Sequence, residues 1–318
     1  LDDTIALHQD AIQRQQYLKK ALLQKLFPVN GEGIPTVRFA TFKEEWEQRK
    51  LQEILKVNSG RDYKHLGSGS IPVYGTGGYM LSVNDKLSDK DAIGIGRKGT
   101  IDKPQYLKAP FWTVDTLFFM IPLNNFDLQF LYTMTQKINW KKMDESTGVP
   151  SLSKAVIEKV NQNIPSYQEQ IKIGGFFKQL DNTIALHQQK QRQIRSLKQG
   201  FIKNLFPNNK NSAPRIRFSI FNDDWNQRNA SEIFTSVSDK NYPELPVLSA
   251  SQEKGMVLRE SNGIDIKYDQ KSTGTYKRVL PGQFVMHLRS FQGGFAYSTI
   301  EGITSPAYTI LAFRNKED

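Results

Sequence analysis

The residue types best suited to recognising a charged ligand occur in polar, glycine-rich stretches, where cations lie close to aromatic rings. Arg and Lys neutralise phosphates, and bidentate Arg or Gln side chains can read guanine or adenine edges in the major groove. The candidates fall in two parts of the chain: Arg61, Lys64, Tyr74, Thr76, Tyr79, Arg97, Lys98 and Thr100 in the first, and Tyr276, Lys277, Arg278, His287, Arg289 and Gln292 in the second. The alternative for each residue is an ordinary solvated loop. The pattern therefore favours two surfaces for nucleic acid.

Signatures of catalysis are incomplete. Residues 94–99 fit the pattern G-x-G-x-x-G, but a dinucleotide-binding turn needs a helix directly afterwards, and residues 101–104 read Ile-Asp-Lys-Pro. Residues 305–308, Ser-Pro-Ala-Tyr, are close to the [N/D]-P-P-[Y/F] box of amino-methyltransferases, yet a serine cannot accept the amino-group hydrogen bond in the same geometry. The four histidines are scattered and the chain has no cysteine. We therefore predict no catalytic site, no bound cofactor and no metal on this chain.

The composition is basic and limits the class of partner. The formal net charge is +11 over 318 residues. By segment it is 0 for 1–34, +4 for 35–165, +6 for 166–213 and +1 for 214–318, so no single basic run supplies it. No apolar stretch approaches the roughly 18 residues of a membrane span. Nucleic acid is therefore a candidate partner and the bilayer is not, and the absence of cysteine agrees with a cytoplasmic location.

The elements that position these residues are duplicated. The chain opens on LDDTIALHQ, and LDNTIALHQ follows at Leu180. Further on, LFPVNGEGIPTVRFATFKEEWEQRK (26–50) aligns without a gap with LFPNNKNSAPRIRFSIFNDDWNQRN (205–229), and beyond about 54 and 233 the copies diverge. Each copy thus has a similar first part and its own remainder, as expected if the two remainders recognise different ligands.

The similar part predicts a long helix in each copy. Apolar or borderline residues recur every three or four positions, which is heptad spacing. The proposed seam residues are Leu1, Ile5, His8, Ile12, Leu180, Ile184, His187, Ile194 and Phe201. Each helix could instead lie on its own domain. Because the two stripes are alike, we expect the helices to pack on each other about a pseudo-twofold axis.

The divergent parts predict mixed strands and turns. Short β-like runs at 71–80, 91–100 and 115–122, and at 284–288, 293–299 and 308–313, are separated by Gly and Pro. The predicted fold class is therefore α+β. Its segments are a spacer helix (1–34), a recognition domain (35–165), a second spacer helix (166–213) and a second recognition domain (214–318).

Several motifs together resemble the specificity subunit of type I restriction–modification systems. They are GRKGT (96–100), PFWTVDTLFF (110–119), TGVPSLSK (147–154) and IPSYQEQIKI (164–173), with GQFVMHLRSFQGGFAYSTIEGITSPAYTIL (282–311) in the second copy. The resemblance implies two target-recognition domains that read a bipartite double-stranded DNA site, and two antiparallel coiled-coil-like helices that set the gap. It also implies a non-catalytic chain in a bacterial or archaeal cytoplasm.

The resemblance implies partners that carry the chemistry. Two modification subunits would methylate adenine with S-adenosylmethionine, and restriction/translocase subunits would use ATP and Mg. The order of segments departs from the family, which usually runs domain, helix, domain, helix. The second copy has no counterpart of residues 145–165, so we expect its domain to lack a closing strand or turn. The alternatives are a methyltransferase that carries its own recognition domains, and a helical scaffold that binds protein.

Overall fold

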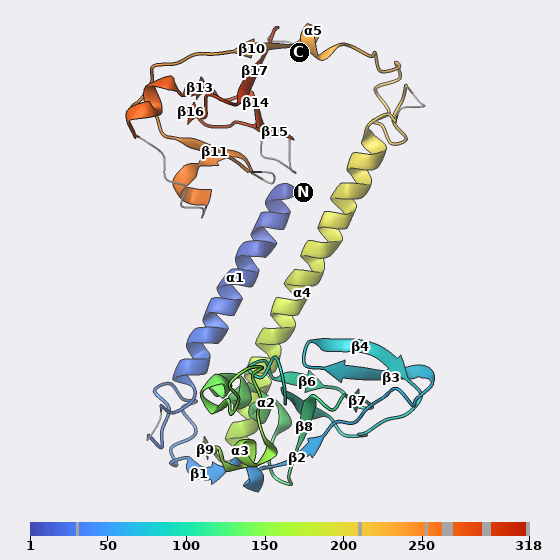
Figure 1. Cartoon of the computed structure of the whole chain (residues 1–318), viewed down its shortest axis with the longest axis vertical. Coiled ribbons are helices and arrows are strands. Elements are labelled where there is room, and N and C mark those ends of the chain that lie inside the picture. Colours follow the sequence, from blue (N-terminus) through green and yellow to red (C-terminus); the bar gives the residue numbers. More distant parts are fainter. Residues whose placement is uncertain (30–31, 209–211, 252–253, 263–269, 288–293, 316–318) are drawn as a thin grey trace. The chain divides into compact units, whose positions relative to one another are not determined.

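The computed structural model describes the chain except residues 30–31, 209–211, 252–253, 263–269, 288–293 and 316–318. The chain divides into two compact units, residues 1–203 and 204–318 (Figure 1). In the first unit two long helices accompany a mixed α+β domain, and the second unit consists mainly of short strands.

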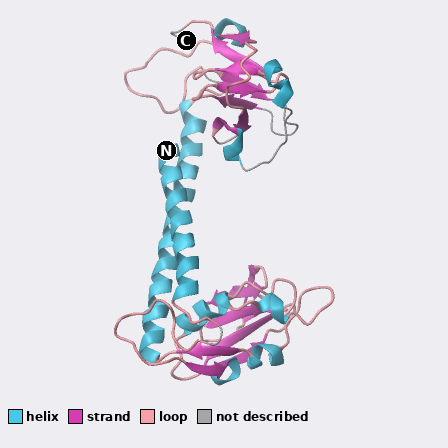
Figure 2. Cartoon of the chain, turned by 90° about the vertical axis from the view of Figure 1, so that its left-hand side faces the viewer, coloured by secondary structure: helices cyan, strands magenta, loops and turns pink. Residues whose placement is uncertain are grey.

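Two long helices lie side by side in the first unit, as both views show (Figures 1 and 2). They are α1 (Asp2–Lys25) and α4 (Tyr167–Leu205), whose last two residues fall in the second unit. The 39 residues of α4 span roughly 58 Å at about 1.5 Å per residue. The helices run antiparallel, because Asp2 contacts Lys198 and Lys19 contacts Asp181. The predicted packing of one helix on the other is confirmed.

Local sequence signals explain where these helices begin and end. Asp2 and Asp3 lie in the first turn of α1, where carboxylates oppose the positive end of the helix dipole. α4 begins two residues after Pro165, and both helices end shortly before a proline, Pro28 or Pro207. The predicted first helix extended to residue 34, whereas α1 ends at Lys25 and an irregular segment follows.

The domain of the first unit has two main sheets. The antiparallel sheet has the order β2 (Leu55–Ser59), β8 (Leu117–Pro122), β5 (Ala92–Gly96), β6 (Gln105–Leu107). The other has the order β4 (Gly78–Val83), β3 (Ser68–Gly75), β7 (Trp112–Thr113). A separate pair joins β1 (Glu47–Lys50) to β9 (Asn161–Ile164), immediately before α4. The last pair links the two ends of the domain.

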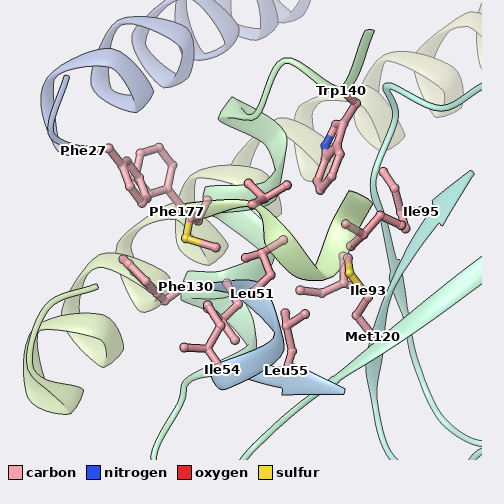
Figure 3. Packing of buried hydrophobic residues seen from close by; sticks show 14 of the residues in the cluster. Phe27, Leu51, Ile54, Leu55, Ile93, Ile95, Met120, Phe130, Trp140 and Phe177 are labelled. Atoms are coloured by element: carbon pink, nitrogen blue, oxygen red, sulfur yellow. The ribbon is translucent and has the colours of Figure 1, made fainter. Parts of the chain in front are cut away.

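Short helices complete the core of this unit. They are α2 (Leu128–Lys137), α3 (Lys154–Lys159) and the 3-10 turns η1 (Leu51–Glu53) and η2 (Trp140–Met143). Every residue of β5 is buried, as expected for a strand covered on both faces. Figure 3 shows Leu51, Ile93 and Met120 packed with Trp140, and Phe27 and Phe177 beside them. The α1–α4 pair and the sheet therefore share one hydrophobic core.

The second unit contains a four-stranded antiparallel sheet in the order β10 (Phe234–Val237), β17 (Thr309–Phe313), β14 (Phe284–His287), β15 (Gly294–Tyr297). Two strand pairs accompany it: β11 (Leu248–Ser251) with β12 (Gly255–Leu258), and β13 (Lys277–Val279) with β16 (Gly302–Thr304). Short helical turns are α5 (Ala230–Ile233), η3 (Arg259–Asn262) and η4 (Gln270–Thr275). Its core is formed by Leu248, Met256, Val279, Val285, Ala296 and Ile310.

Candidate nucleic-acid interface

Two polar segments of the first unit, which follow β2 and β5, lie at one end of its antiparallel sheet. Ser59 pairs with Phe118 and Gly96 pairs with Leu117, so β2 and β5 end on opposite sides of the start of β8. Arg61 lies two residues after the end of β2, and Arg97 directly follows β5. The sheet order thus brings together two cations that lie far apart in the sequence.

The loop after β5 carries Arg97, Lys98 and Thr100. Arg97 donates its backbone N–H to Thr116 at 2.7 Å, and the Arg97 carbonyl accepts from Leu152 at 2.9 Å. Gly96 has no room for a side chain, since a Cβ there would lie 2.0 Å from the Thr100 carbonyl oxygen. Both cationic side chains are exposed, and the Arg97 guanidinium lies 5.8 Å from the Phe118 ring centre. Among the described residues, neither cation is paired with a carboxylate.

A second loop, residues 144–151, lies against the first. Lys98 and Ser151 form an isolated antiparallel β-bridge through their backbones, and the Gly99 N–H donates to the Pro150 carbonyl at 2.8 Å. The Asp144 Oδ1 holds this loop, accepting from Ser151 N at 2.9 Å and from Ser146 Oγ and N at 2.8 and 3.0 Å. These hydrogen bonds lower the pKa of Asp144, and the bond from the Ser151 backbone has the largest effect. Sequence reasoning did not include this loop among the candidates, although the TGVPSLSK motif at 147–154 was its visible signal.

The β3–β4 hairpin supplies the aromatic rings. Tyr74 and Tyr79 lie with ring centres 6.4 Å apart in an edge-on arrangement, and Tyr79 is exposed. Gln105 Nε2 donates to the carbonyls of Gly75 and Thr76 at 2.9 and 3.1 Å. The Thr76 hydroxyl lies 3.9 Å from where a Cβ would stand on Gly99. Thr76 is therefore a neighbour of the Arg97–Thr100 loop.

The segment after β2 lies on the same side of the fold. Arg61 donates its N–H to Thr113 at 2.9 Å, and its carbonyl accepts from Trp112 Nε1 at 2.9 Å. The side chains of Arg61 and Lys64 are exposed. Exposed carboxylates accompany them at Asp62, Asp115 and Glu145, so this end of the domain is mixed in charge. Such a surface can approach phosphates with its cations and offer acceptors to exocyclic amino groups.

The second-unit candidates are placed differently. The Arg278 guanidinium donates to Glu301 Oε1 at 2.8 and 2.5 Å and to Asp239 Oδ2 at 3.4 Å, and the bonds to Glu301 raise its pKa. Lys277 Nζ donates to the Tyr308 carbonyl at 2.7 Å. Both cations are thus already engaged within the unit.

The remaining second-unit candidates contribute less exposed surface. Tyr276 is half-buried, and its N–H donates to the Thr273 carbonyl at 3.0 Å. His287 is buried, its Nδ1 has no hydrogen-bond partner among the described residues, and its ring centre is 6.1 Å from that of Tyr308. Arg289 and Gln292 lie outside the described residues. The structure therefore brings together the first-unit candidates more closely than the second-unit ones.

The helix seam contains polar contacts among its apolar ones. Ile12, Leu180 and Ile184 are buried, whereas Ile5 and Ile194 are half-buried. His8 Nδ1 lies 2.9 Å from His187 Nδ1. Gln191 Nε2 donates to Gln9 Oε1 at 2.8 Å. The two ends of the stripe, Leu1 and Phe201, are exposed.

The contacts of the two helices repeat across the pair. His8 and His187 are separated by 179 positions, which is the offset of the duplication, so each helix meets the other at its own equivalent residue. The same offset converts the ion pair Lys19–Asp181 into the ion pair Lys198–Asp2. Equivalent residues therefore make equivalent contacts on either side of the histidines.

Among the residues that the structure describes, no group of three or more His, Cys, Asp or Glu side chains could hold a metal ion. Within the same described part of the chain, no helix has both the length and the apolar character needed to cross a membrane.

The first unit is thus an α+β domain joined to a pair of long antiparallel helices. Residues 43–196 match the family described as "Type I restriction modification DNA specificity domain". Residues 43–196, about half of the chain, are therefore identified as a type I restriction–modification DNA specificity domain.

Two solved structures were matched, and the first has a similar fold. One is the S subunit of a type I restriction–modification system from M. genitalium, with a TM-score of 0.53 and 20% identity over 65% of this chain and 58% of that one. Another is the HsdS subunit from Thermoanaerobacter tengcongensis, with a TM-score of 0.43 and 15% identity over 63% of this chain and 53% of that one. This chain thus spans a little over half of each. No curated protein sequence matches it.

Proposed function

We propose that this chain is a non-catalytic specificity subunit that recognises a bipartite DNA site in a bacterial or archaeal cytoplasm. The first unit would read one half-site and the second unit the other. The observation that carries the proposal is the convergence of Arg61, Arg97 and Lys98 at one sheet end, beside Tyr74 and Tyr79. Cations on an exposed loop can reach phosphates or guanine edges, and tyrosines can pack against sugars or bases.

Selection from randomised duplex DNA, followed by a binding titration, tests this proposal. We expect a split consensus, with affinity that falls steeply as salt rises because phosphate contacts release counterions. Arg97→Ala with Lys98→Ala should weaken binding, while Lys20→Ala with Lys159→Ala removes the same charge from exposed helical positions and should have less effect. Equal DNA affinity of the two double variants would exclude the Arg97–Lys98 loop from the DNA interface. Tight binding of S-adenosylmethionine by the chain alone would instead favour a methyltransferase.

The helix pair would act as the spacer between half-sites. The support is the length of α4 together with the repeated contacts about His8 and His187. Insertion of four residues between Phe177 and Phe201 adds about one turn. If α4 is a ruler, selection should then return the same half-sites with a different gap. An unchanged gap would exclude the spacer role.

The helices would also dock two modification subunits, which use S-adenosylmethionine, and the assembly would recruit restriction/translocase subunits that use ATP and Mg. Exposed leucines support this part, since Leu7 and Leu18 of α1 have exposed equivalents in Leu186 and Leu197 of α4. Two like patches suit two copies of one partner. Leu7→Ser with Leu186→Ser should reduce co-purification of the modification subunit and leave DNA binding by the chain intact. Loss of both together would point to misfolding instead.

A further inference from the structure

Two connector segments repeat the same local fold. The first connector (residues 26–50) follows α1 and the second connector (205–229) follows α4. Each contains a phenylalanine and a tryptophan in edge-on contact: Phe27 and Trp46 at 5.9 Å and 80°, Phe206 and Trp225 at 5.9 Å and 82°. The aromatic centre of each connector thus has the same geometry.

Backbone contacts within the connectors also recur. Trp46 N donates to Gly33 O at 2.8 Å, and Trp225 N donates to Ser212 O at 3.0 Å. Equivalent arginines bond equivalent carbonyls, Arg38 to Glu44 and Arg217 to Asp223. The second connector therefore has the same internal contacts as the first, although the sequence that follows it is different.

The first connector is covered by later parts of the first unit. Phe27 contacts Phe130 of α2 at 5.5 Å and Phe177 of α4 at 6.2 Å between ring centres (Figure 3). The Arg38 guanidinium makes a two-pronged pair with the buried Glu169 carboxylate, with both N–O distances 2.8 Å. Strand β1 pairs with β9. As a result Phe27 is 3% exposed and Trp46 is 4% exposed.

The second connector presents the same groups to solvent. Phe206 is 56% exposed and Trp225 is 46% exposed. Phe218 and Ile220 nearby are exposed too. In the described part of the chain, no carboxylate pairs with Arg217, and residues 226–229, equivalent to β1, form no strand. An exposed pair of packed aromatic rings is apolar surface of the kind that marks protein interaction sites.

We propose that the second connector is a preformed docking face for a strand-and-helix segment with the chemistry of residues 161–180, supplied from outside residues 1–318. The strand of the bound segment would pair with residues 226–229. Its carboxylate would form a two-pronged ion pair with the Arg217 guanidinium, and its aromatic ring would pack over Phe206 and Trp225. A planar guanidinium matches a carboxylate in two-pronged geometry, and an extended segment adds readily to an open edge. The chain's own residues 161–180 are already committed to the first connector.

A synthetic peptide of residues 161–180 tests the proposal with the full chain. Trp46, Trp112 and Trp140 are buried, so exposed Trp225 is the tryptophan accessible to acrylamide. Added peptide should protect it from quenching, and a labelled peptide should give a saturable anisotropy change. Arg217→Glu should weaken binding at least about tenfold. The peptide with Glu169→Arg should bind the Arg217→Glu variant better than it binds the unchanged chain.

A matched pair of variants distinguishes specific binding of the peptide at the second connector from non-specific binding to any exposed apolar surface. Phe206→Ser should reduce binding, whereas Phe295→Ser removes a ring on β15 that is at least as exposed and should not reduce it. Unchanged circular dichroism of each variant establishes that the chain is still folded. Absence of binding at about 1 mM peptide, or equal binding by the Arg217→Glu variant and the unchanged chain, would overturn the proposal. The test is independent of DNA.

Discussion

The Nδ1 atoms of His8 and His187 lie 2.9 Å apart at the centre of the antiparallel helix pair. One imidazole must donate and the other accept, so the bond requires at least one neutral ring. The residues are equivalents in the duplicated sequence, and the ion pairs Lys19–Asp181 and Asp2–Lys198 flank them. The duplication therefore supplies the pair with polar contacts that specify its register.

We expect His8 and His187 to be energetically coupled. A double-mutant cycle with His8→Ala, His187→Ala and both together, followed by urea unfolding, measures the interaction free energy. A single hydrogen bond of this kind should give about 1 kcal/mol. Strict additivity of the two single changes would show that the contact contributes no stability.

The Arg38–Glu169 pair should be more costly to break. Glu169 is buried at the start of α4, so Glu169→Ala leaves the Arg38 charge with little solvent and, among the described residues, only the Glu44 carbonyl as a partner. We expect a loss of about 3 kcal/mol in the free energy of unfolding. Glu47→Ala removes an exposed pair with Arg49 and should cost less than about 1 kcal/mol. Similar losses for the two variants would contradict the structure.

Neighbouring glycines in α4 should respond in opposite directions. A Cβ at Gly174 would lie 2.5 Å from Asp127 Oδ1 and 2.7 Å from Phe130 N, at the start of α2. A Cβ at Gly175 meets nothing within 4 Å. Gly174→Ala should therefore lower the melting temperature. Gly175→Ala should raise stability by roughly 0.5–1 kcal/mol, because alanine is the better helix former. Equal effects would mean that α4 does not approach α2 this closely.

Tyr106 should titrate late. Burial, together with its 2.9 Å hydrogen bond to Asp91, raises the pKa of Tyr106 to about 12. An unfolded tyrosine ionises near pH 10, so between about pH 10 and 12 the unfolded state loses a proton that the folded state keeps. Stability therefore falls as pH rises through this window. Phenolate absorbance should show a late component that Tyr106→Phe removes, and a titration unchanged by that substitution would contradict the assignment.

Periodicity and duplication alone were sufficient to predict much of the architecture. The heptad spacing predicted the long helices, and prolines at 28, 165 and 207 explain their limits. The β-like runs at 91–100 and 115–122 contain β5 and β8. The pattern G-x-G-x-x-G is followed by no helix in the structure, as the prolyl segment after it indicated. These features depend on neighbours close in the chain, so a single sequence carries them.

Only the tertiary structure decided which side chains meet. The strand order β2-β8-β5 places Arg61 and Arg97 at the same end of the sheet, and the β3–β4 hairpin places Thr76 near Gly99. Arg278 was a candidate DNA-binding cation in the sequence, but it is paired with Asp239 and Glu301, which lie 39 and 23 positions away. Likewise, Trp46 and Trp225 occupy equivalent positions, and one is buried while the other is exposed. The sequence determined the local shape of each connector, whereas long-range packing decided which connector was covered.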